Sequence, residues 1–575
     1  MLAASVLSLG LASGAHATVI LGSSSDLKDE YVDLEQREYV APVASDFTSG
    51  GSAAVPLLAG SIGTQRQSPA FVPNGVVVKS FEGISQYDVA SYSRNFIPPD
   101  TMGAVGKTQY SEFVNGGFAV FDKSGTVVKA ISDVAFWNAA GQTSANGDTR
   151  VMYDKSADRW IALSFASSVA NIQIAVSDTA NAAGTWKSTV FTGFAGGTAD
   201  YPTLALDDSA VYIGTNNFNS AGSFRGTTLN VIPLSSLVSA AAPTTAGLKQ
   251  FVTPYSPTTG GVDGGYAIQG VNQSGNGTNG KVAAVSLFYA ALATWDITNA
   301  GTPGAARVNG AYVDGTADYD GNDAARQPNA LPDVNPNPPT SGNYFPSNDR
   351  VIDTLDDRVG SSVYEVNGRI YTVHTVTPTG GDHTVVRIDV IDAATNTVLD
   401  EHDIGDATHD FWEGSLAVNN LGQVVVAYNR SGSNAADGKI SFLATTYSTG
   451  VTGKLTQRGA TQLLQVSAVD DYHNGSVDGQ VASGRQRWGD YSAVSLDPSD
   501  SKSFWVVGEF AREYNDGTDH PGGTGGSRWG TWISQISLST TAVPEPSQWA
   551  LMFSGFGLLG GVARRRRAAL KVTYA

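Results

Sequence analysis

The chain contains no cysteine among its 575 residues. Disulfide bonds, thiolate metal ligands and cysteine-based catalysis are therefore excluded, and the redox state of its compartment cannot be inferred from disulfides. The stability of the fold must come from the packing of its secondary structure.

Positive charge is also scarce. The sequence has 35 Lys and Arg against 53 Asp and Glu, a net charge of −18, and five of the basic residues follow Pro546 with no acid beside them. Without that tail, 30 basic residues face 53 acidic ones, which gives −23. Nucleic acids and anionic membranes bind clustered Lys and Arg, so they are poor partners for this body, and metal cations or neutral polymers such as polysaccharides are more compatible with it.

Recognised catalytic and nucleotide-binding motifs are absent as well. The sequence has no HExxH zinc motif, no GxSxG nucleophile elbow and no Walker loop. Gly275, Gly277 and Gly280 fit the dinucleotide-binding spacing, but no strand pattern precedes them and no helix pattern follows. The seven histidines are scattered, which favours isolated histidines over a zinc or acid/base pair built on His409 and Glu413.

Short aromatic-rich strands joined by tight turns are the dominant pattern. The sequence has 65 Gly, 22 Tyr and 22 Phe, and no long stretch repeats apolar residues every 3.6 positions. Residues Arg487–Phe510 (RWGDYSAVSLDPSDSKSFWVVGEF) show the unit most clearly. Alternating apolar positions, an Asp-Pro-Ser-Asp turn and a return strand predict a β-hairpin there.

The same unit recurs along the chain. Further copies lie at Asp100–Val120, Asp148–Phe165, Asp200–Asn217, Val282–Trp295, Ser361–Val376 and Trp412–Tyr428. About seven such units of roughly 60 residues predict an all-β fold, a β-propeller with seven blades. We expect Val76–Ile84 to pair with Thr531–Leu538 and close the ring. The Ser235–Gly280 and Asp314–Asn348 segments have loop-like compositions and are expected to project from one face.

The segments outside this body suggest export. Residues 1–17 are expected to be a signal peptide, because an apolar run precedes Ala15-His16-Ala17. Residues 18–75 are predicted to be a flexible, disordered lead-in, residues 76–540 the propeller, and residues 549–563 a short hydrophobic helix before Arg564–Arg567. Fifteen residues span about 22 Å, less than the roughly 30 Å of a bilayer core, which favours transient membrane insertion over a permanent transmembrane helix.

The C-terminus resembles a known sorting signal. Val543-Pro544-Glu545-Pro546, the apolar segment and the four arginines Arg564, Arg565, Arg566 and Arg567 occur in the order of the PEP-CTERM signal, at residues 543–567. The resemblance implies processing by an exosortase-type enzyme and a cell-surface or extracellular destination in a Gram-negative bacterium. Proteins with this signal commonly belong to species that make extracellular polysaccharide.

The body also resembles a largely uncharacterised family of secreted, propeller-like bacterial proteins. The matching stretches are FEGI at Phe81, PPDTMGAVG at Pro98, FAVFDKSG at Phe118, GDTRVMYDKSADRW at Gly147, AVSDTANAAGTW at Ala175, DYPTLAL at Asp200, DTLDDRV at Asp353 and RWGDYSAVSLDPSD at Arg487. The resemblance implies the fold and names no reaction or ligand.

An acidic residue precedes the inner strand in five of the units. Aligning the units brings together Asp100, Asp148, Asp200, Glu413 and Asp490. In a propeller they would converge at one mouth of the central channel, where a hard cation such as Ca²⁺ or an arginine would be needed to offset their repulsion. The alternative, which we favour, is that each acid caps the turn of its own blade, and Arg150, Arg358 and Arg487 are further candidates to pair with them.

A second acidic group lies in one predicted loop. Asp314, Asp318, Asp320 and Asp323 fall within ten residues, with glycines between them. This density of carboxylates suits calcium, but the spacing does not match an EF-hand, and a solvated acidic loop is favoured.

These features favour a non-enzymatic, exported propeller that binds or scaffolds extracellular material such as polysaccharide. No cofactor is required by the sequence beyond the Ca²⁺ candidates. The alternative is a secreted polysaccharide hydrolase or lyase that uses acids at the channel mouth, because two suitably placed carboxyls suffice for glycoside cleavage. The ten tryptophans, Trp160, Trp412, Trp488, Trp505 and Trp529 among them, could provide a sugar-stacking surface, although core packing is their more ordinary role.

Overall fold

The structure is a computed structural model, and it describes most of the chain from residue 74 to residue 538. The gaps in this range are residues 95, 240, 257–259, 262, 273–278, 308–309, 321–323, 329–350, 361, 473–484 and 515–526. The predicted signal peptide, nearly all of the lead-in and the C-terminal hydrophobic segment lie outside the described residues.

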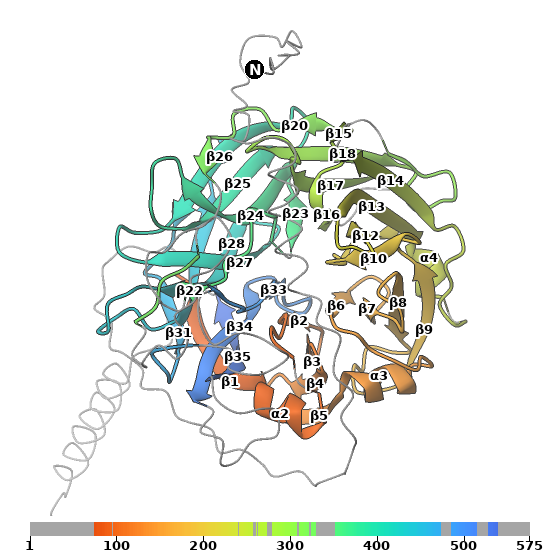
Figure 1. Ribbon diagram of the computed structural model, residues 1–575, viewed down its shortest axis with the longest axis horizontal. Coiled ribbons are helices and arrows are strands. Elements are labelled where there is room, and N and C mark those ends of the chain that lie inside the picture. Colours follow the sequence, from red (N-terminus) through yellow and green to blue (C-terminus); the bar gives the residue numbers. More distant parts are fainter. Residues whose placement is uncertain are drawn as a thin grey trace, which may run out of the picture.

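Antiparallel sheets arranged around a common centre form a propeller, with the first strand of most sheets nearest the centre (Figure 1). Two four-stranded sheets contain β2–β5 (Met102–Val105, Gln109–Val114, Gly117–Asp122, Val127–Ser132) and β6–β9 (Arg150–Asp154, Arg159–Phe165, Asn171–Ser177, Trp186–Thr192). A third joins β33–β35 (Ala493–Leu496, Ser503–Tyr514, Ser527–Ser537) to β1 (Val76–Ser85).

The remaining sheets are larger or smaller. The six-stranded sheet contains β10–β15 (Gly197–Asp200, Ala205–Leu206, Ala210–Asn219, Phe224–Pro233, Lys249–Ser256, Gly260–Gly261), and the five-stranded sheet contains β27–β31 (Asp410–Val418, Gln423–Ser431, Ser441–Thr449, Leu455–Gln457, Gln462–Val466). The ten-stranded sheet contains β16–β21 (Tyr266–Asn272, Gly280–Val285, Leu292–Thr298, Ala306–Arg307, Ala311–Tyr312, Tyr319–Asp320) and β23–β26 (Val363–Val366, Arg369–Pro378, Val385–Asp392, Thr397–Ile404). The short strands β22 (Val351–Ile352) and β32 (Arg485–Gln486) pair with each other.

The all-β propeller is confirmed, but the predicted count of seven blades is not supported. Within the described residues, five separate sheets of four to six strands accompany the ten-stranded sheet. That sheet is continuous because β16 pairs in parallel with β23, at Val271↔Val363 and Asn272↔Tyr364. Counting repeats in the sequence could not reveal this, because a parallel pair between distant segments leaves no local pattern.

The ring closes as the sequence predicts. Strand β1 pairs antiparallel with β35, so that Val76 lies opposite Ser537 and Phe81 opposite Ile533. Phe81 then packs its ring 5.2 Å from Phe121 and 6.3 Å from Trp505. Pairing the first strand with the last removes two exposed edges from the ring.

The predicted hairpin at Arg487–Phe510 is also present. Strands β33 and β34 pair antiparallel from Ala493↔Val507 to Leu496↔Phe504. Trp505 and Val507 belong to the largest apolar core, while Val494, Phe504 and Val506 pack into the core shared with the sheet of β27–β31. The alternation of the sequence thus fills the spaces on both sides of this sheet.

One predicted loop contains strands of the propeller. The Ser235–Gly280 segment contains β14 and β16, and every residue of β16 is buried. The small and polar residues of this segment suggest a loop, but small residues are needed in this strand because it packs closely. A Cβ added to Gly270 would lie 2.6 Å from the Cβ of Tyr212 and 2.7 Å from the Cβ of Ala205. The other predicted loop contributes the short strand β21.

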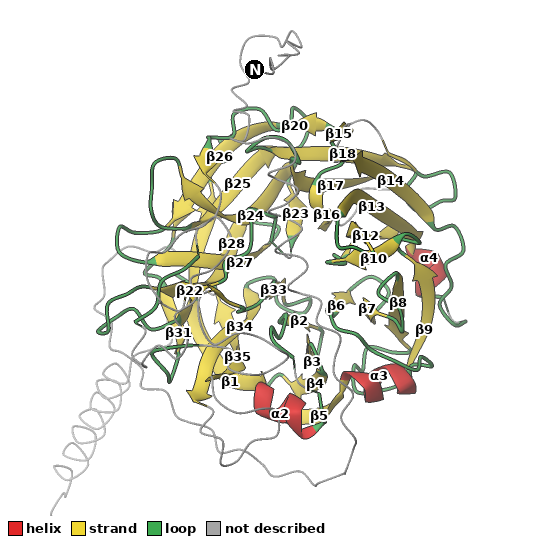
Figure 2. Ribbon diagram, viewed as in Figure 1, coloured by secondary structure: helices red, strands yellow, loops and turns green. Residues whose placement is uncertain are grey.

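Helices are few and short in the described part of the chain (Figure 2). They are α2 (Gln86–Ser91), α3 (Asp133–Ala139) and α4 (Leu234–Leu237). Among the described residues, none is long and apolar enough to cross a membrane. The predicted helix at 549–563 lies outside those residues and stays a prediction.

Candidate functional site

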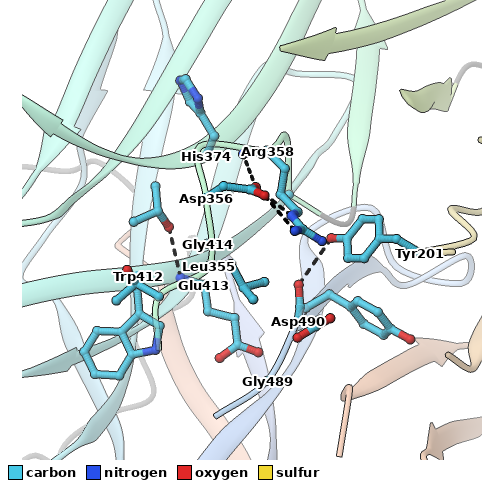
Figure 3. Close-up of a pocket in the computed structure, with 14 residues that line it drawn as sticks. Tyr201, Leu355, Asp356, Arg358, His374, Trp412, Glu413, Gly414, Gly489 and Asp490 are labelled. Carbon is cyan, nitrogen blue, oxygen red and sulfur yellow. Dashed lines mark hydrogen bonds and ion pairs between the residues drawn. The ribbon is translucent and has the colours of Figure 1, made fainter. Parts of the chain in front are cut away.

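A small pocket lies where segments of several sheets meet (Figure 3). Its lining comes from β24, from β27 and from the segments that precede β11, β23 and β33. The lining residues are Tyr201, Thr354, Leu355, Asp356, Arg358, Gly360, His374, Thr375, Trp412, Glu413, Gly414, Gly489, Asp490 and Tyr491. The pocket offers about 30 Å³ to the centres of water-sized molecules, room for roughly two waters. A small ion or one polar group of a larger ligand fits it, whereas a whole sugar ring does not.

A repeated backbone conformation builds this region. Six non-glycine residues in or before the inner strands have positive φ angles between 48° and 59°, with Leu355 in the segment between β22 and β23: Asp100, Asp148, Tyr201, Ala267, Leu355 and Glu413. Non-glycine residues rarely adopt this left-handed conformation, which costs about 1–3 kcal/mol each. Its recurrence at the same place in successive units means that the packing around the centre imposes it.

Asp490 and Asp100 interact directly. One carboxylate oxygen of Asp100 accepts the backbone N–H of Asp490 at 3.2 Å, and the other accepts the amide of Asn115 at 2.6 Å. Burial raises the pKa of Asp100 to about 6, although Arg487 opposes the rise. The Arg487 guanidinium pairs with the Asp490 carboxylate. Asp100 therefore links two sheets. The sequence had favoured a different role, in which Asp100 caps the turn of its own blade.

A second ion pair borders the pocket. Arg358 Nε and Nη2 each donate to the Asp356 carboxylate at 2.7 Å, and the guanidinium lies 4.3 Å from the centre of the Tyr201 ring. The Tyr201 hydroxyl donates to the backbone oxygen of Asp490 at 3.2 Å (Figure 3). Bidentate pairing and ring stacking hold the arginine in one position.

Glu413, which lines the pocket, and Glu509, which does not, form an unusual acidic pair beside Gly489. A Cβ placed on Gly489 would lie 2.3 Å from Glu509 Oε1 and 2.7 Å from Glu413 Oε1, so the two oxygens are at most 5.0 Å apart, the sum of these distances. Glu413 is 9% exposed and Glu509 is 0% exposed. Burial raises the pKa of Glu413 to about 8, with the nearby Asp100 carboxylate adding to the rise, and burial with the charge of Glu413 raises that of Glu509 well above its ordinary range.

Polar atoms without hydrogen-bond partners also border the pocket. Neither carboxylate oxygen of Glu413 accepts a hydrogen bond within the described structure, and the indole Nε1 of Trp412 donates none. Trp412 is 1% exposed. Buried polar groups are nearly always paired, so a donor and an acceptor left without partners in one pocket indicate a place for a ligand or water.

The structure gathers the five predicted channel-mouth acids only in part. All five are buried, and Glu413 and Asp490 line the pocket. Asp100 lies behind Asp490, while Asp148 acts electrostatically on Tyr491 and Asp200 precedes Tyr201 in the chain. A shared role for all five remains a prediction.

The predicted calcium loop is exposed where it is described. Asp314, Asp318 and Asp320 lie at the surface, and Asp320 accepts the backbone N–H of Gly380 at 3.0 Å. Asp323 falls outside the described residues. Across the described chain, no group of three or more His, Asp or Glu side chains is placed to hold a metal ion. His409 bonds Asp406 through Nδ1 at 2.9 Å, which fits the isolated role favoured for it.

Several residues of the site escaped sequence reasoning. Glu509 lies in the middle of β34, and no local motif marks it. Arg358 was a candidate partner for the five acids, but its bidentate pairing with Asp356 was not predicted. The five tryptophans singled out from the sequence are all fully buried, and only Trp412 reaches the pocket. The sequence aligned Asp200 with the other acids, whereas the neighbouring Tyr201 adopts the left-handed conformation in that unit.

Comparison with known families identifies the end of the chain. Residues 542–567 match the family described as the PEP-CTERM protein-sorting motif. The C-terminus carries a PEP-CTERM sorting motif. This PEP-CTERM motif confirms the predicted signal and implies processing by an exosortase and export to the envelope or surface of a Gram-negative bacterium. The match is confined to the terminus, so the resemblance of the body to an uncharacterised secreted family stays a prediction.

Solved structures that resemble this chain include one described as a propeller. An apocarotenoid oxygenase mutant from Synechocystis shares 10% identity over 64% of this chain and 71% of that chain, with a TM-score of 0.36. The Dos1 propeller shares 10% over 81% and 96%, with a TM-score of 0.34. An endo-arabinase from Bacteroides thetaiotaomicron shares 12% over 66% and 91%, with a TM-score of 0.27. No curated protein matches the chain. At these identities and TM-scores, the similarities carry no information about activity.

Proposed function

We propose that this chain is an exported surface or matrix protein whose propeller binds extracellular polysaccharide without cleaving it. The PEP-CTERM motif supplies the route of export. The strongly acidic body disfavours nucleic acids and anionic lipids, and a neutral, hydroxyl-rich polymer is compatible with it.

The observation that carries this proposal is the donor and acceptor left without partners in the pocket. The Trp412 indole N–H can donate one hydrogen bond, and the Glu413 carboxyl can accept others. Sugar hydroxyls both accept and donate hydrogen bonds, so the hydroxyls of a polysaccharide offer a partner to each of these groups. Because the pocket holds only about two waters, the remainder of the polymer would lie across its mouth.

The neighbouring ion pair suits a binding role. Arg358 is held by Asp356 and stacked on Tyr201, so its position is fixed before a ligand arrives. Tyr201 and Tyr491 both border the pocket, and their rings lie 5.9 Å apart. Rigid aromatic and arginine side chains lower the entropic cost of binding.

A polysaccharide hydrolase is the second candidate, and the Glu413–Glu509 pair favours it. Retaining glycosidases place two carboxyls about 5–5.5 Å apart, and the Oε1 atoms of this pair lie at or below the short end of that range, at most 5.0 Å apart. Glu509, however, is fully enclosed and does not line the pocket. A nucleophile must reach the sugar, so this enclosure supports binding over cleavage.

A glycan array combined with a reducing-sugar release assay tests the proposal. We expect retention of at least one extracellular polysaccharide by the wild type with no release of reducing ends, and loss of retention in Glu413→Gln. Glu112→Gln is the matched control, because Glu112 is also fully buried but lies on β3, away from the pocket. Release of product that Glu413→Gln or Asp490→Asn abolishes would instead support the hydrolase.

A further inference from the structure

The Glu413–Glu509 pair poses a problem that sugar binding does not solve. The two side chains come from β27 and β34, which belong to different sheets, and both approach Gly489. Glu509 is fully buried and Glu413 nearly so. Two carboxylates in such a place repel each other and lose hydration, so each requires a compensating partner.

Within the described structure, only one of the four carboxyl oxygens of this pair accepts a hydrogen bond. The Thr101 hydroxyl donates to Glu509 Oε1 at 3.0 Å. Glu509 Oε2 and both side-chain oxygens of Glu413 accept no hydrogen bond. Three of the four oxygens therefore accept no hydrogen bond, although the Trp488 side chain lies close enough to Glu413 to lower the pKa of its carboxyl.

The nearby arginines have other partners. Arg487 pairs with Asp490, and Arg358 pairs with Asp356. Arg150 lies 3.2 Å from the centre of the Tyr491 ring and donates from Nε to the backbone oxygen of Pro202 at 3.1 Å. Asp100 adds a further negative charge that acts on both glutamates. The pair thus sits in a negative environment that these arginines do not neutralise.

We propose that Glu413 and Glu509 together bind one Ca²⁺ ion at the inner edge of the pocket. Calcium takes six to eight oxygen ligands in a flexible geometry and accepts carboxylates, carbonyls and water. Two carboxylates would supply part of this shell, and the pocket has room for about two of the remaining waters. With few protein ligands, the affinity should fall in the weak range of extracellular modules, about 10⁻⁴–10⁻³ M.

This inference does not depend on the polysaccharide. The ion would offset two buried charges whether or not a sugar occupies the pocket mouth. The test therefore uses calcium chloride alone, and a negative glycan array would leave its result unaffected.

Calorimetric titration of the chelator-treated full chain at pH 8 tests the site. We expect one Ca²⁺ bound per chain and a higher melting temperature in calcium than in EDTA. Glu413→Gln and Glu509→Gln should each weaken binding by about tenfold or more, because each removes an anionic ligand. Glu112→Gln should bind calcium like the wild type.

Three results would overturn the proposal. The wild type could take up no calcium at millimolar concentrations, which would mean that the two glutamates share a proton instead. Both glutamate variants could retain wild-type affinity. Glu112→Gln could lose binding to the same degree as they do. Because the two site variants are independent, one of them can fail to fold without removing the test.

Discussion

Several residues near the centre of the ring lie in environments that are unfavourable for them individually. Asp100, Glu413 and Glu509 are buried acids, and Ala267 and Leu355 adopt a left-handed backbone. Natural proteins tolerate such strain where the surrounding structure imposes it, and it concentrates at functional sites. We therefore regard the centre of the ring, and not the exposed acidic loop, as the functional region.

The buried carboxyl of Glu112, away from the pocket, should make the stability of the protein depend on pH. Glu112 accepts the Ile84 N–H at 2.8 Å, and burial raises its pKa from 4.5 to about 8. Between those values the folded chain keeps the proton that the unfolded chain releases, so stability falls as pH rises from about 5 to 8. Glutamine cannot ionise, so the free energy of unfolding of Glu112→Gln should fall by about 2–4 kcal/mol less than that of the wild type over this range. Urea unfolding of both proteins at about pH 5 and pH 8 measures the difference. Parallel losses in the two proteins would contradict the assignment.

The strain of the left-handed backbone should affect the stability cost of glycine substitutions. Ala267, with a φ of 49°, and Ala283 are both fully buried. Glycine adopts positive φ without cost, so Ala267→Gly should destabilise the protein by about 1–2 kcal/mol less than Ala283→Gly. Equal costs in thermal unfolding would mean that Ala267 is not strained.

At the scale of the elements, sequence reasoning succeeded where the signal is local. Alternating residues around a turn predicted the β33–β34 hairpin, and the edges left by the first and last strands predicted the β1–β35 pair. The same reasoning failed for β16, whose Gly-containing sequence is accommodated by close contact with Tyr212. The same holds for the site. The alignment of the repeated units predicted Glu413 and Asp490, but no local sequence pattern predicted Glu509. Its partner lies on another sheet, and only the fold brings the two together.

The closing strand should contribute strongly to stability. Phe81 in β1 is 6% exposed and contacts Phe121 and Trp505, while Val78 on the same strand is 47% exposed. Phe81→Ala should cost about 3–5 kcal/mol in urea unfolding, because it leaves a cavity where the ring closes. Val78→Ala is the control and should change stability by less than about 0.5 kcal/mol. Similar effects of the two substitutions would show that β1 does not hold the ring closed.

At the scale of the whole molecule, the acidic propeller and the basic terminus have separate tasks. The PEP-CTERM motif supplies export and processing, and the propeller supplies the pocket. Replacing Pro544, Glu545 and Pro546 with alanine should prevent processing by the exosortase. Mass spectrometry of the protein from the producing cells should then find a heavier precursor, whereas Ser547→Ala should be processed normally. An unchanged mature mass in the triple variant would contradict this assignment.

We propose that the propeller binds a polysaccharide and leaves it intact. The most direct measurement is co-incubation of the protein with the producing bacterium's extracellular polysaccharide, followed by size-exclusion chromatography that detects both components. We predict that protein and polymer elute together, that Glu413→Gln elutes separately, and that the polymer keeps its length after prolonged incubation. A polymer shortened by the wild type but not by Glu413→Gln would contradict the account and establish a hydrolase or lyase in its place.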